Sequence, residues 1–270
     1  MPEPLPAELA AALDATRRRR GPFGESISYV AEATSTNDIA ATLAAAGARE
    51  GTIVIAGAQT AGRGRLGRTW FSPPGAGLYM SIVLRSQAAA PFVTLAAGVA
   101  VADGVRAATG LPLELKWPND VVTSGARGPA PRRKIAGILA EASSSADGVE
   151  YIVLGVGVNL TPAAYPREIA DRASCVEIEL GRSVDAGAIA GEILSALASW
   201  WPSLTAGDGA RLLGRWRTLS PSASGAAVEC EAGGGRLHGI TAGIDDTGAL
   251  LVRGAGGVER IVAGQVVWKP

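Results

Sequence analysis

Residues 134–160 read KIAGILAEASSSADGVEYIVLGVGVNL and contain two apolar runs on either side of a short polar segment. Runs of this length that are rich in Val, Ile and Leu are typical of strands. We therefore expect residues 134–141 and 149–160 to pair as a hairpin that turns within 143–148. This hairpin is the starting point for the rest of the predicted fold.

Strand and helix patterns flank this hairpin without a regular alternation. Helices are expected at 6–19, 34–46, 91–109, 185–201 and 208–218, and further strands at 27–30, 52–58, 78–84 and 113–116. A doubly wound parallel sheet requires regular strand and helix repeats, so the pattern favours an α+β fold with a mixed sheet packed with helices. The segment 123–133, TSGARGPAPRR, is expected to be an exposed connection.

The sequence changes character after Ser220. Short strand patterns are separated by glycine-containing turns at 233–235, 246–248 and 256–257, which leave no room for a helix. We expect a small β-barrel here, and hence a domain of residues 1–220 followed by one of residues 221–270.

Composition excludes several classes of protein. The chain has 270 residues with 25 basic and 25 acidic side chains, so no global charge points to nucleic acid. Cys175 and Cys230 form no CxxC pair and His238 is the only histidine, which argues against a disulfide framework and a zinc site. Apolar runs such as 151–160 fall short of the ~20 residues of a membrane span, and no signal peptide is evident at Met1, so a cytoplasmic location without membrane attachment is expected.

Lysine is rare in this chain. Of the 25 basic residues only Lys116, Lys134 and Lys269 are lysines, and the others are arginines. A GC-rich genome explains the arginine background. Because an ammonium is a compact charge with an adjustable pKa, a lysine kept among arginines is a candidate for a specific role.

The most distinctive loop is 59–70, QTAGRGRLGRTW. From Gly62 to Gly67 it matches the GxGxxG dinucleotide pattern, but that pattern requires a helix to begin there, and the sequence FSPPG at 71–75 forbids a long one. We therefore reject a Rossmann site. The loop suits either phosphate binding by its amides and three arginines, with Trp70 stacking on a base, or simply a solvated basic surface.

Two further segments carry chemical groups. KWPND at 116–120 places Lys116 on an apolar strand, where a buried ammonium needs a partner such as Asp120 or a ligand anion. LGVGVNL at 154–160 spaces two glycines so that another group can approach the backbone closely, although by itself it is more simply a tightly packed core strand.

Taken together, these segments resemble the biotin protein ligases. Members of that family show, in order, Ser-Thr-Asn, a Gln followed by GRGRxGRxW, KWPND, KxxGxLxE and GxGxN. This chain has matching residues at 35–37, 59–70, 116–120, 134–141 and 155–159. Five motifs in this order over residues 27–160 are a specific signature, and the tail around 239–250 resembles the SH3-like C-terminal barrel of the family.

The resemblance implies a fold and a reaction. The fold would be a catalytic domain like that of class II aminoacyl-tRNA synthetases with an SH3-like barrel behind it. Biotin would be activated by ATP and Mg²⁺ to biotinyl-AMP, and a lysine of a biotin carboxyl carrier protein domain of a carboxylase would then receive the biotin.

The resemblance also implies roles for individual residues. Lys134 and Arg63 would be catalytic. The biotin-binding residues would be Ser35, Thr36, Asn37, Gln59, Arg63, Gly64, Arg65 and Lys134. The residues that bind ATP or the adenylate would be Arg65, Arg68, Trp70, Lys116, Asn119, Asp120 and Asn159. No resident metal site is expected.

Two departures and two alternatives accompany this resemblance. Thr34 stands where many relatives have an acid, and the segment 123–133 is longer than expected. About 26 residues precede the first strand, so no DNA-binding domain and no DNA partner are expected. The expected oligomeric state is a monomer or a weak homodimer. A lipoate protein ligase would share the fold, and a nucleic-acid-binding module would use Arg17 to Arg20 with the loop at 59–70.

Overall fold

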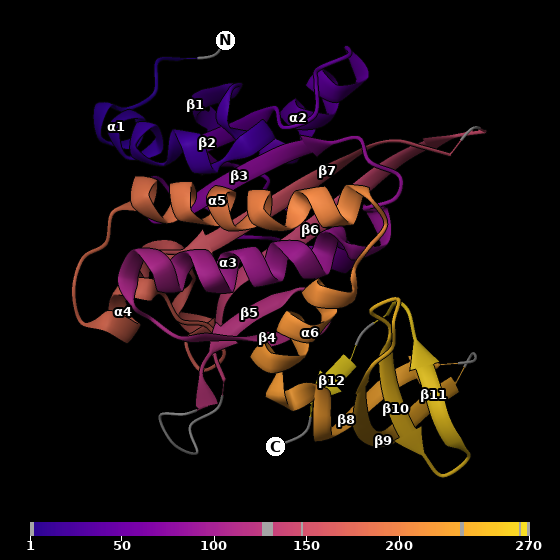
Figure 1. The fold of residues 1–270 in the computed structure, drawn as a ribbon. Helices are drawn as coiled ribbons and strands as arrows, with labels where there is room; N and C mark the ends of the chain where they lie inside the picture. Colours follow the sequence, from indigo (N-terminus) through magenta and orange to yellow (C-terminus); the bar gives the residue numbers. More distant parts are fainter. Residues whose placement is uncertain (1–2, 126–131, 147, 233–234, 265, 269–270) are drawn as a thin grey trace.

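The computed structural model describes residues 3–125, 132–146, 148–232, 235–264 and 266–268 (Figure 1). Its main element is a seven-stranded sheet with the strand order β1-β2-β3-β7-β6-β5-β4. The strands are β1 (Ile27–Ala33), β2 (Ile53–Gln59), β3 (Gly77–Leu84), β4 (Leu113–Lys116), β5 (Asp120–Thr123), β6 (Lys134–Ser145) and β7 (Gly148–Asn159). β1 and β2 are parallel, and the other described pairs are antiparallel, so the expected mixed sheet is confirmed.

The central hairpin is longer than the sequence pattern indicated. β6 and β7 pair from Ala136 opposite Val158 to Ser145 opposite Gly148, with a shift of register between Ser143 and Ser144. The two strands lie in the middle of the sheet, with three strands beyond β7 and two beyond β6. The hairpin therefore presents residues to both faces over its whole length.

The helices of the first part of the chain lie on both faces of this sheet. They are α1 (Ala7–Thr16), α2 (Thr36–Ala45), α3 (Val93–Thr109), α4 (Val176–Leu180), α5 (Ala186–Thr205) and α6 (Ala210–Leu219). α3 contacts β4, β5, β6 and β7 and is packed against α5, whereas α2 contacts β2, β3 and β7 (Figure 1). The large core lies under α3 and α5, and a smaller cluster of Ala40, Ala44, Val54, Val83 and Val153 lies under α2.

Alternation along β7 separates these two faces. Ile152, Leu154, Val156 and Val158 belong to the large core. Val153 belongs to the cluster under α2, and the next residues on its face are Gly155, Gly157 and Asn159. Because successive side chains of a strand point to opposite faces, the same hairpin supplies a core on one side and polar or glycine positions on the other.

α3 is the core helix of the fold. The segment Ala90–Thr109 has the length and apolar composition of a membrane span, which the inspection of apolar runs did not detect. In the fold, 61% of the most apolar 18 residues of this segment are buried, and residues such as Ala96, Val99 and Val101 are almost inaccessible. Burial inside the protein explains its apolar sequence.

The tail forms a second sheet that contacts the first part of the chain. Its strands are β8 (Ser224–Ala232), β9 (Gly235–Ile244), β10 (Leu250–Gly254), β11 (Gly257–Ile261) and β12 (Val266–Trp268), in the antiparallel order β11-β10-β9-β8-β12. β11 and β12 are the edges, and no ladder joins them within the described residues, so the expected closed barrel is not observed there. Trp117 donates from Nε1 to the carbonyl of Gly248 at 3.0 Å, and Arg217 donates from Nη2 to the carbonyl of Ile244 at 3.0 Å.

Two elements were missing from the sequence expectations. β5 returns directly after the Trp117–Pro118 turn and pairs with β4, with Lys116 opposite Asp120, whereas the sequence placed only a turn and a loop there. α4 is a single short helix after the segment 161–175. Of the expected exposed connection at 123–133, residues 126–131 lie outside the described part of the chain.

Candidate functional site

The candidate site lies on the face of β6 and β7 that is opposite the large core. Gly137 of β6 stands across from Gly157 of β7. A Cβ added at Gly157 would lie 2.5 Å from Nε1 of Trp70, and one added at Gly155 would lie 2.5 Å from Oδ1 of Asn37. The two glycines of LGVGVNL are therefore needed because side chains of two other motifs pack directly on the backbone.

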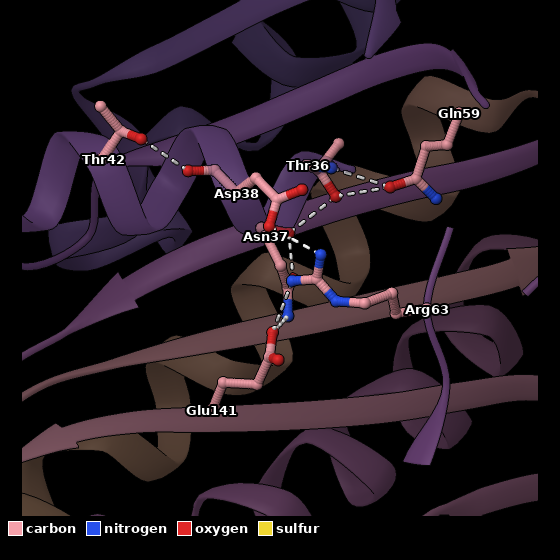
Figure 2. Close-up of polar contacts among 8 residues, drawn as sticks. Thr36, Asn37, Asp38, Thr42, Gln59, Arg63 and Glu141 are labelled. Carbon is pink, nitrogen blue, oxygen red and sulfur yellow. Dashed lines mark hydrogen bonds and ion pairs between the residues drawn. The ribbon is translucent and has the colours of Figure 1, made fainter. Parts of the chain in front are cut away.

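The turn between β1 and α2 is held by a hydrogen-bonded network of neutral groups (Figure 2). Thr36 donates from its backbone nitrogen to Oε1 of Gln59 at 2.8 Å and from its hydroxyl at 3.1 Å. The hydroxyl of Ser81 lies 2.7 Å from Oγ1 of Thr36 and 2.6 Å from Oδ1 of Asn37. Ser35 precedes this helix in extended conformation and is 3% exposed. Three motif residues are thus fixed by one another at the start of α2.

Gln59 connects this network to the glycine-rich loop. Its Nε2 donates to the hydroxyl of Ser72 at 2.9 Å, and this hydroxyl donates to the carbonyl of Trp70 at 3.1 Å. Sequence inspection missed Ser72 and Ser81. A usable signal existed for Ser81, because Tyr79 and Ser81 are the only residues with a hydroxyl group in the otherwise apolar strand GLYMSIVL. The Ser81 side chain is completely buried.

Arg63 is held by two carboxylates (Figure 2). Its Nη1 lies 2.6 Å from Oδ1 of Asp38, and its Nη2 lies 3.2 Å from Oε2 of Glu141. Asn37 donates from Nδ2 to the same Glu141 oxygen at 2.5 Å. The hydrogen bond to Asp38 raises the pKa of Arg63, opposed by partial burial. The first motif, the glycine-rich loop and the KxxGxLxE strand therefore meet at this guanidinium.

The rest of the glycine-rich loop has the form of a tight hairpin. Arg63 and Thr69 form an isolated β-bridge, and Arg65–Gly67 makes a single 3₁₀ turn in which Leu66 has φ 57°. The GxGxxG glycines are followed by this single 3₁₀ turn and not by an α-helix, as the sequence FSPPG at 71–75 predicted. A Cβ added at Gly62 would lie 2.4 Å from the carbonyl oxygen of Trp70, so this glycine allows the loop to close on itself.

Two arginines of this loop are placed differently. Arg65 is half-buried and donates from Nη1 to Oδ1 of Asn119 at 3.3 Å, and burial lowers its pKa. Asn119 in turn donates to the carbonyl of Ile138 at 2.8 Å, which fixes the β4–β5 turn to β6. Arg68 is exposed. The structure brings Arg65 to the KWPND segment and leaves Arg68 at the surface.

Lys134 lies at the centre of the polar face. Its Nζ is 2.6 Å from Oδ1 of Asp120 and 5.2 Å from the ring centroid of Trp70. Trp70 covers Gly137 and Gly157, and its buried Nε1 has no hydrogen-bond partner in the described structure. The ring of Trp70 is therefore in contact with the ammonium and with the sheet on this face.

Lys116 has a different environment from the one the sequence suggested first. Asp120, named as its possible partner, forms its ion pair with Lys134. The ammonium of Lys116 lies over the ring of Trp268, 5.6 Å from its centroid. Burial lowers the pKa of Lys116, and the charge of Asp120 partly opposes this.

Asn159 closes the site at the end of β7. Its side chain is 4% exposed and donates from Nδ2 to the carbonyl of Ser174 at 3.0 Å and to that of Lys134 at 3.5 Å. These bonds fix the first residue of β6 to the segment before α4. Contact of Asn159 with a base stays a prediction.

The assembled site is a concentration of cations on a polar sheet face. Lys116 of β4, Lys134 of β6 and two arginines of the glycine-rich loop, Arg63 and Arg65, converge here from three segments. Asp38, Asp120 and Glu141 lie among them. Within the described ranges, no group of three or more His, Cys, Asp or Glu side chains is arranged to hold a metal ion. Next to Arg65, a cleft of about 350 Å³ between the two parts of the chain is lined by Leu66, Leu95, Trp117 and Gly248, among others. Such an arrangement suits a polyanionic ligand that also has an apolar part.

Comparison with known proteins gives a consistent result. Residues 29–159 match the model of the biotin/lipoate A/B protein ligase family, and residues 223–268 match that of the biotin protein ligase C-terminal domain. A biotin acetyl-CoA-carboxylase ligase from Paracoccus denitrificans is 36% identical over 79% of this chain and 88% of its own length. The corresponding ligase from Mycobacterium tuberculosis is 34% identical over 89% of this chain and 88% of its own length.

The fold is also that of solved ligases. Biotin protein ligase from Aquifex aeolicus, in complex with biotin and ATP, superposes with a TM-score of 0.77 at 26% identity. The match covers 91% of this chain and 99% of that one.

Proposed function

Since the chain belongs to the biotin protein ligases, we propose that its polar sheet face performs both steps of protein biotinylation. Biotin reacts with ATP to give biotinyl-5′-AMP and pyrophosphate, and biotin is then transferred to a lysine of an acceptor protein. The observation that carries this proposal is the convergence of all five motifs on one face of β6 and β7, around Lys134 and Arg63.

In the first step, a carboxylate oxygen of biotin attacks the α-phosphorus of ATP and the bond to the β-phosphate oxygen breaks. Two anions approach each other, and the leaving pyrophosphate gains charge, so fixed cations lower the barrier. Lys134 is the ammonium assigned to the biotin carboxylate and the α-phosphate. In this structure Asp120 and the ring of Trp70 hold it on the sheet face.

Biotin occupies the start of α2 in this proposal. Ser35, Thr36, Asn37 and Gln59 supply neutral donors and acceptors for the ureido ring, and the Ser81 hydroxyl fixes two of them. Further contacts come from the glycine-rich loop and from β6. These are made by Arg63, Gly64, Arg65 and Lys134.

The nucleotide lies along the KWPND side of the face. Lys116 and Lys134 meet the phosphates, and Arg65 and Arg68 close the loop over the adenylate. Trp70, Asn119, Asp120 and Asn159 complete the nucleotide-binding set. Mg²⁺ bound with ATP would neutralise phosphate charge, and Asp120, whose Oδ1 lies 2.6 Å from Nζ of Lys134, is the carboxylate that would be available to it.

In the second step, the neutral amine of the acceptor lysine attacks the acyl carbon of biotinyl-AMP and AMP leaves. The acceptor is the biotin carboxyl carrier protein domain of a biotin-dependent carboxylase, in accordance with the names of the relatives from P. denitrificans and M. tuberculosis. We place this activity in the cytoplasm. We assign residues 1–220 to the catalytic domain and 221–270 to an SH3-like barrel, supported by the five antiparallel strands β8 to β12.

The deciding experiment is biotin-dependent exchange of labelled pyrophosphate into ATP by the purified chain. Exchange is expected with biotin and not with lipoate or octanoate, and a carrier domain should become labelled when biotin and ATP are present. Exchange with lipoate but not with biotin would assign the chain to lipoate attachment instead.

A further inference from the structure

Each of the two lysines on the polar face is covered by the ring of a tryptophan. Trp70 covers Lys134 and comes from the adjacent glycine-rich loop. Trp268 covers Lys116 and comes from β12, in the second sheet. The second tryptophan is therefore the point at which the tail of the chain contacts a residue of the candidate site.

Lys116 has no carboxylate partner of its own in the described part of the chain. Its nearest acid, Asp120, is taken by Lys134 at 2.6 Å. Glu114, on the same face of β4 two residues earlier, forms an ion pair with Arg132 at 2.5 Å. The charges that act on the Lys116 ammonium are thus one shared carboxylate and two further cations, Lys134 and Arg132. The partly buried ammonium of Lys116 is therefore not neutralised by an anion of its own, and a phosphate group of a ligand would supply one.

Trp268 is suited to hold this ammonium without neutralising it. β12 pairs with β8 with Trp268 opposite Val228, and the indole packs partly on the core. Its Nε1 is buried and makes no hydrogen bond to any described residue, so the contact that distinguishes Trp268 is that of its ring face with Lys116. A tryptophan ring attracts a cation more strongly than the other aromatic side chains do, and it leaves the positive charge available to a ligand.

We propose that Trp268 is a positioning residue for adenylation, and that its ring holds the Lys116 ammonium where the β- and γ-phosphates of ATP enter the site. This inference rests on the proposed ligase activity. It adds a contribution from the second sheet, through a single residue, to nucleotide binding. Biotin, which is assigned to the start of α2 on the opposite side of Lys134, is not affected by this contact.

The test is a double-mutant cycle in the full-length chain, read by pyrophosphate exchange. Wild type must first catalyse exchange with biotin, and failure there rejects the ligase activity rather than the role of Trp268. Trp268→Met keeps apolar volume without a ring and is expected to raise the KM for ATP by about three- to tenfold with the KM for biotin unchanged. Trp268→Phe is expected to recover most of this loss.

The second half of the cycle removes the ammonium. In a Lys116→Met background, whose own KM for ATP is raised, Trp268→Met is expected to change that constant by less than about twofold. An equal increase in the KM values for ATP and biotin in Trp268→Met would show that Trp268 has only a structural role. A rise in the KM for ATP that persists in the Lys116→Met background would show the same. If Trp268→Met does not fold, the same cycle with Trp268→Leu decides, because leucine also keeps apolar volume without a ring.

Trp200 provides a matched control. Its ring contacts Arg211 at 5.8 Å, at the junction of α5 and α6 and away from the polar face. Trp200→Met removes the same type of contact and is expected to leave both KM values unchanged. A rise in the KM for ATP in this variant equal to that of Trp268→Met would overturn the proposal.

Discussion

The two faces of the β6–β7 hairpin differ in the role of their residues: one face packs in the core and the other supports the candidate site. On one face Ile138, Leu154 and Val156 are at most 4% exposed and pack under α3 and α5. On the other face the neighbours of these residues include three glycines, Gly137, Gly155 and Gly157. The side chain of Trp70 lies over Gly137 and Gly157, and its ring in turn contacts the Lys134 ammonium. The apolar face stabilises by excluding water, whereas the polar face provides space and charge at defined positions.

This difference has an energetic consequence. Removing a methyl group from the apolar face leaves a cavity and lowers stability. Adding a methyl group to the polar face displaces a side chain of the site. A change of one carbon atom on the apolar face should therefore alter the free energy of unfolding. The same change on the polar face should alter catalysis.

The largest expected effect is the loss of the central ammonium from the polar face. Lys134→Ala should lower kcat/KM for adenylate formation by about a hundred- to a thousandfold, or about 3 to 4 kcal/mol, because a fixed charge at the reacting groups is lost. Lys134→Arg should restore activity only in part, since the planar guanidinium places its charge differently. Single-turnover formation of biotinyl-AMP measures both. An arginine variant equal to wild type would mean that positive charge alone suffices.

An added methyl on the polar face should have the next largest effect. Gly157→Ala forces Trp70 to move, because the new Cβ would lie 2.5 Å from its Nε1. We expect kcat/KM for ATP to fall by about ten- to a hundredfold, with at most about 3 kcal/mol of stability lost. Gly214→Ala is the control, since no described atom beyond its chain neighbours and the backbone of helix α6 lies within 4 Å of that added Cβ. Full activity in Gly157→Ala would show that the position of Trp70 is unimportant.

A removed methyl on the apolar face should produce the opposite result. Ile152→Val, three residues before Gly155 on β7, is expected to lower the free energy of unfolding by about 0.5 to 1.5 kcal/mol. The KM values for ATP and biotin should stay within about twofold of wild type, because Ile152 belongs to the large core. Urea denaturation and pyrophosphate exchange measure the two quantities. A shifted KM with unchanged stability would contradict the separation of the faces.

The smallest energetic change is expected in the glycine-rich loop that covers the polar face. Two exposed ion pairs of Arg63, to Asp38 and Glu141, hold it in this structure, and such pairs contribute about 1 kcal/mol or less each. Trypsin should therefore cut at the arginines of 63–68 in the free protein, and biotin with a non-hydrolysable ATP analogue should protect them. Cutting at the same rate with saturating ligand would argue against loop closure.

Sequence patterns predicted the elements well wherever the periodicity was local. The hairpin at β6 and β7, the core helix α3 and the helices α5 and α6 were expected close to their observed bounds. β5 was missed because its four residues, DVVT, are too short to show a period and its partner strand is decided by the turn before it. α4 was missed because five residues carry too few apolar positions to define a helical face.

The candidate site was predicted by its motifs but not by its contacts. The order of residues indicated which groups are chemically important, including the two lysines retained among arginines. It did not reveal that Asp120 pairs with Lys134 rather than with Lys116. Lys116 stands opposite Asp120 in the β4–β5 ladder, and only packing decides that the carboxylate meets the other lysine. Ser81, Asp38 and Glu141 acquire their roles from strands and helices that are far apart in the chain.

What the sequence alone determined is therefore the set of chemical groups and the local structures that carry them. Composition, periodicity of two along strands and glycine spacing depend on neighbours within a few residues, so they can be read directly. The tertiary structure alone decided which cation meets which anion, and that a tryptophan 152 residues after Lys116 covers its ammonium. Such pairings depend on the register of strands and on the packing of separate sheets, which no local pattern contains.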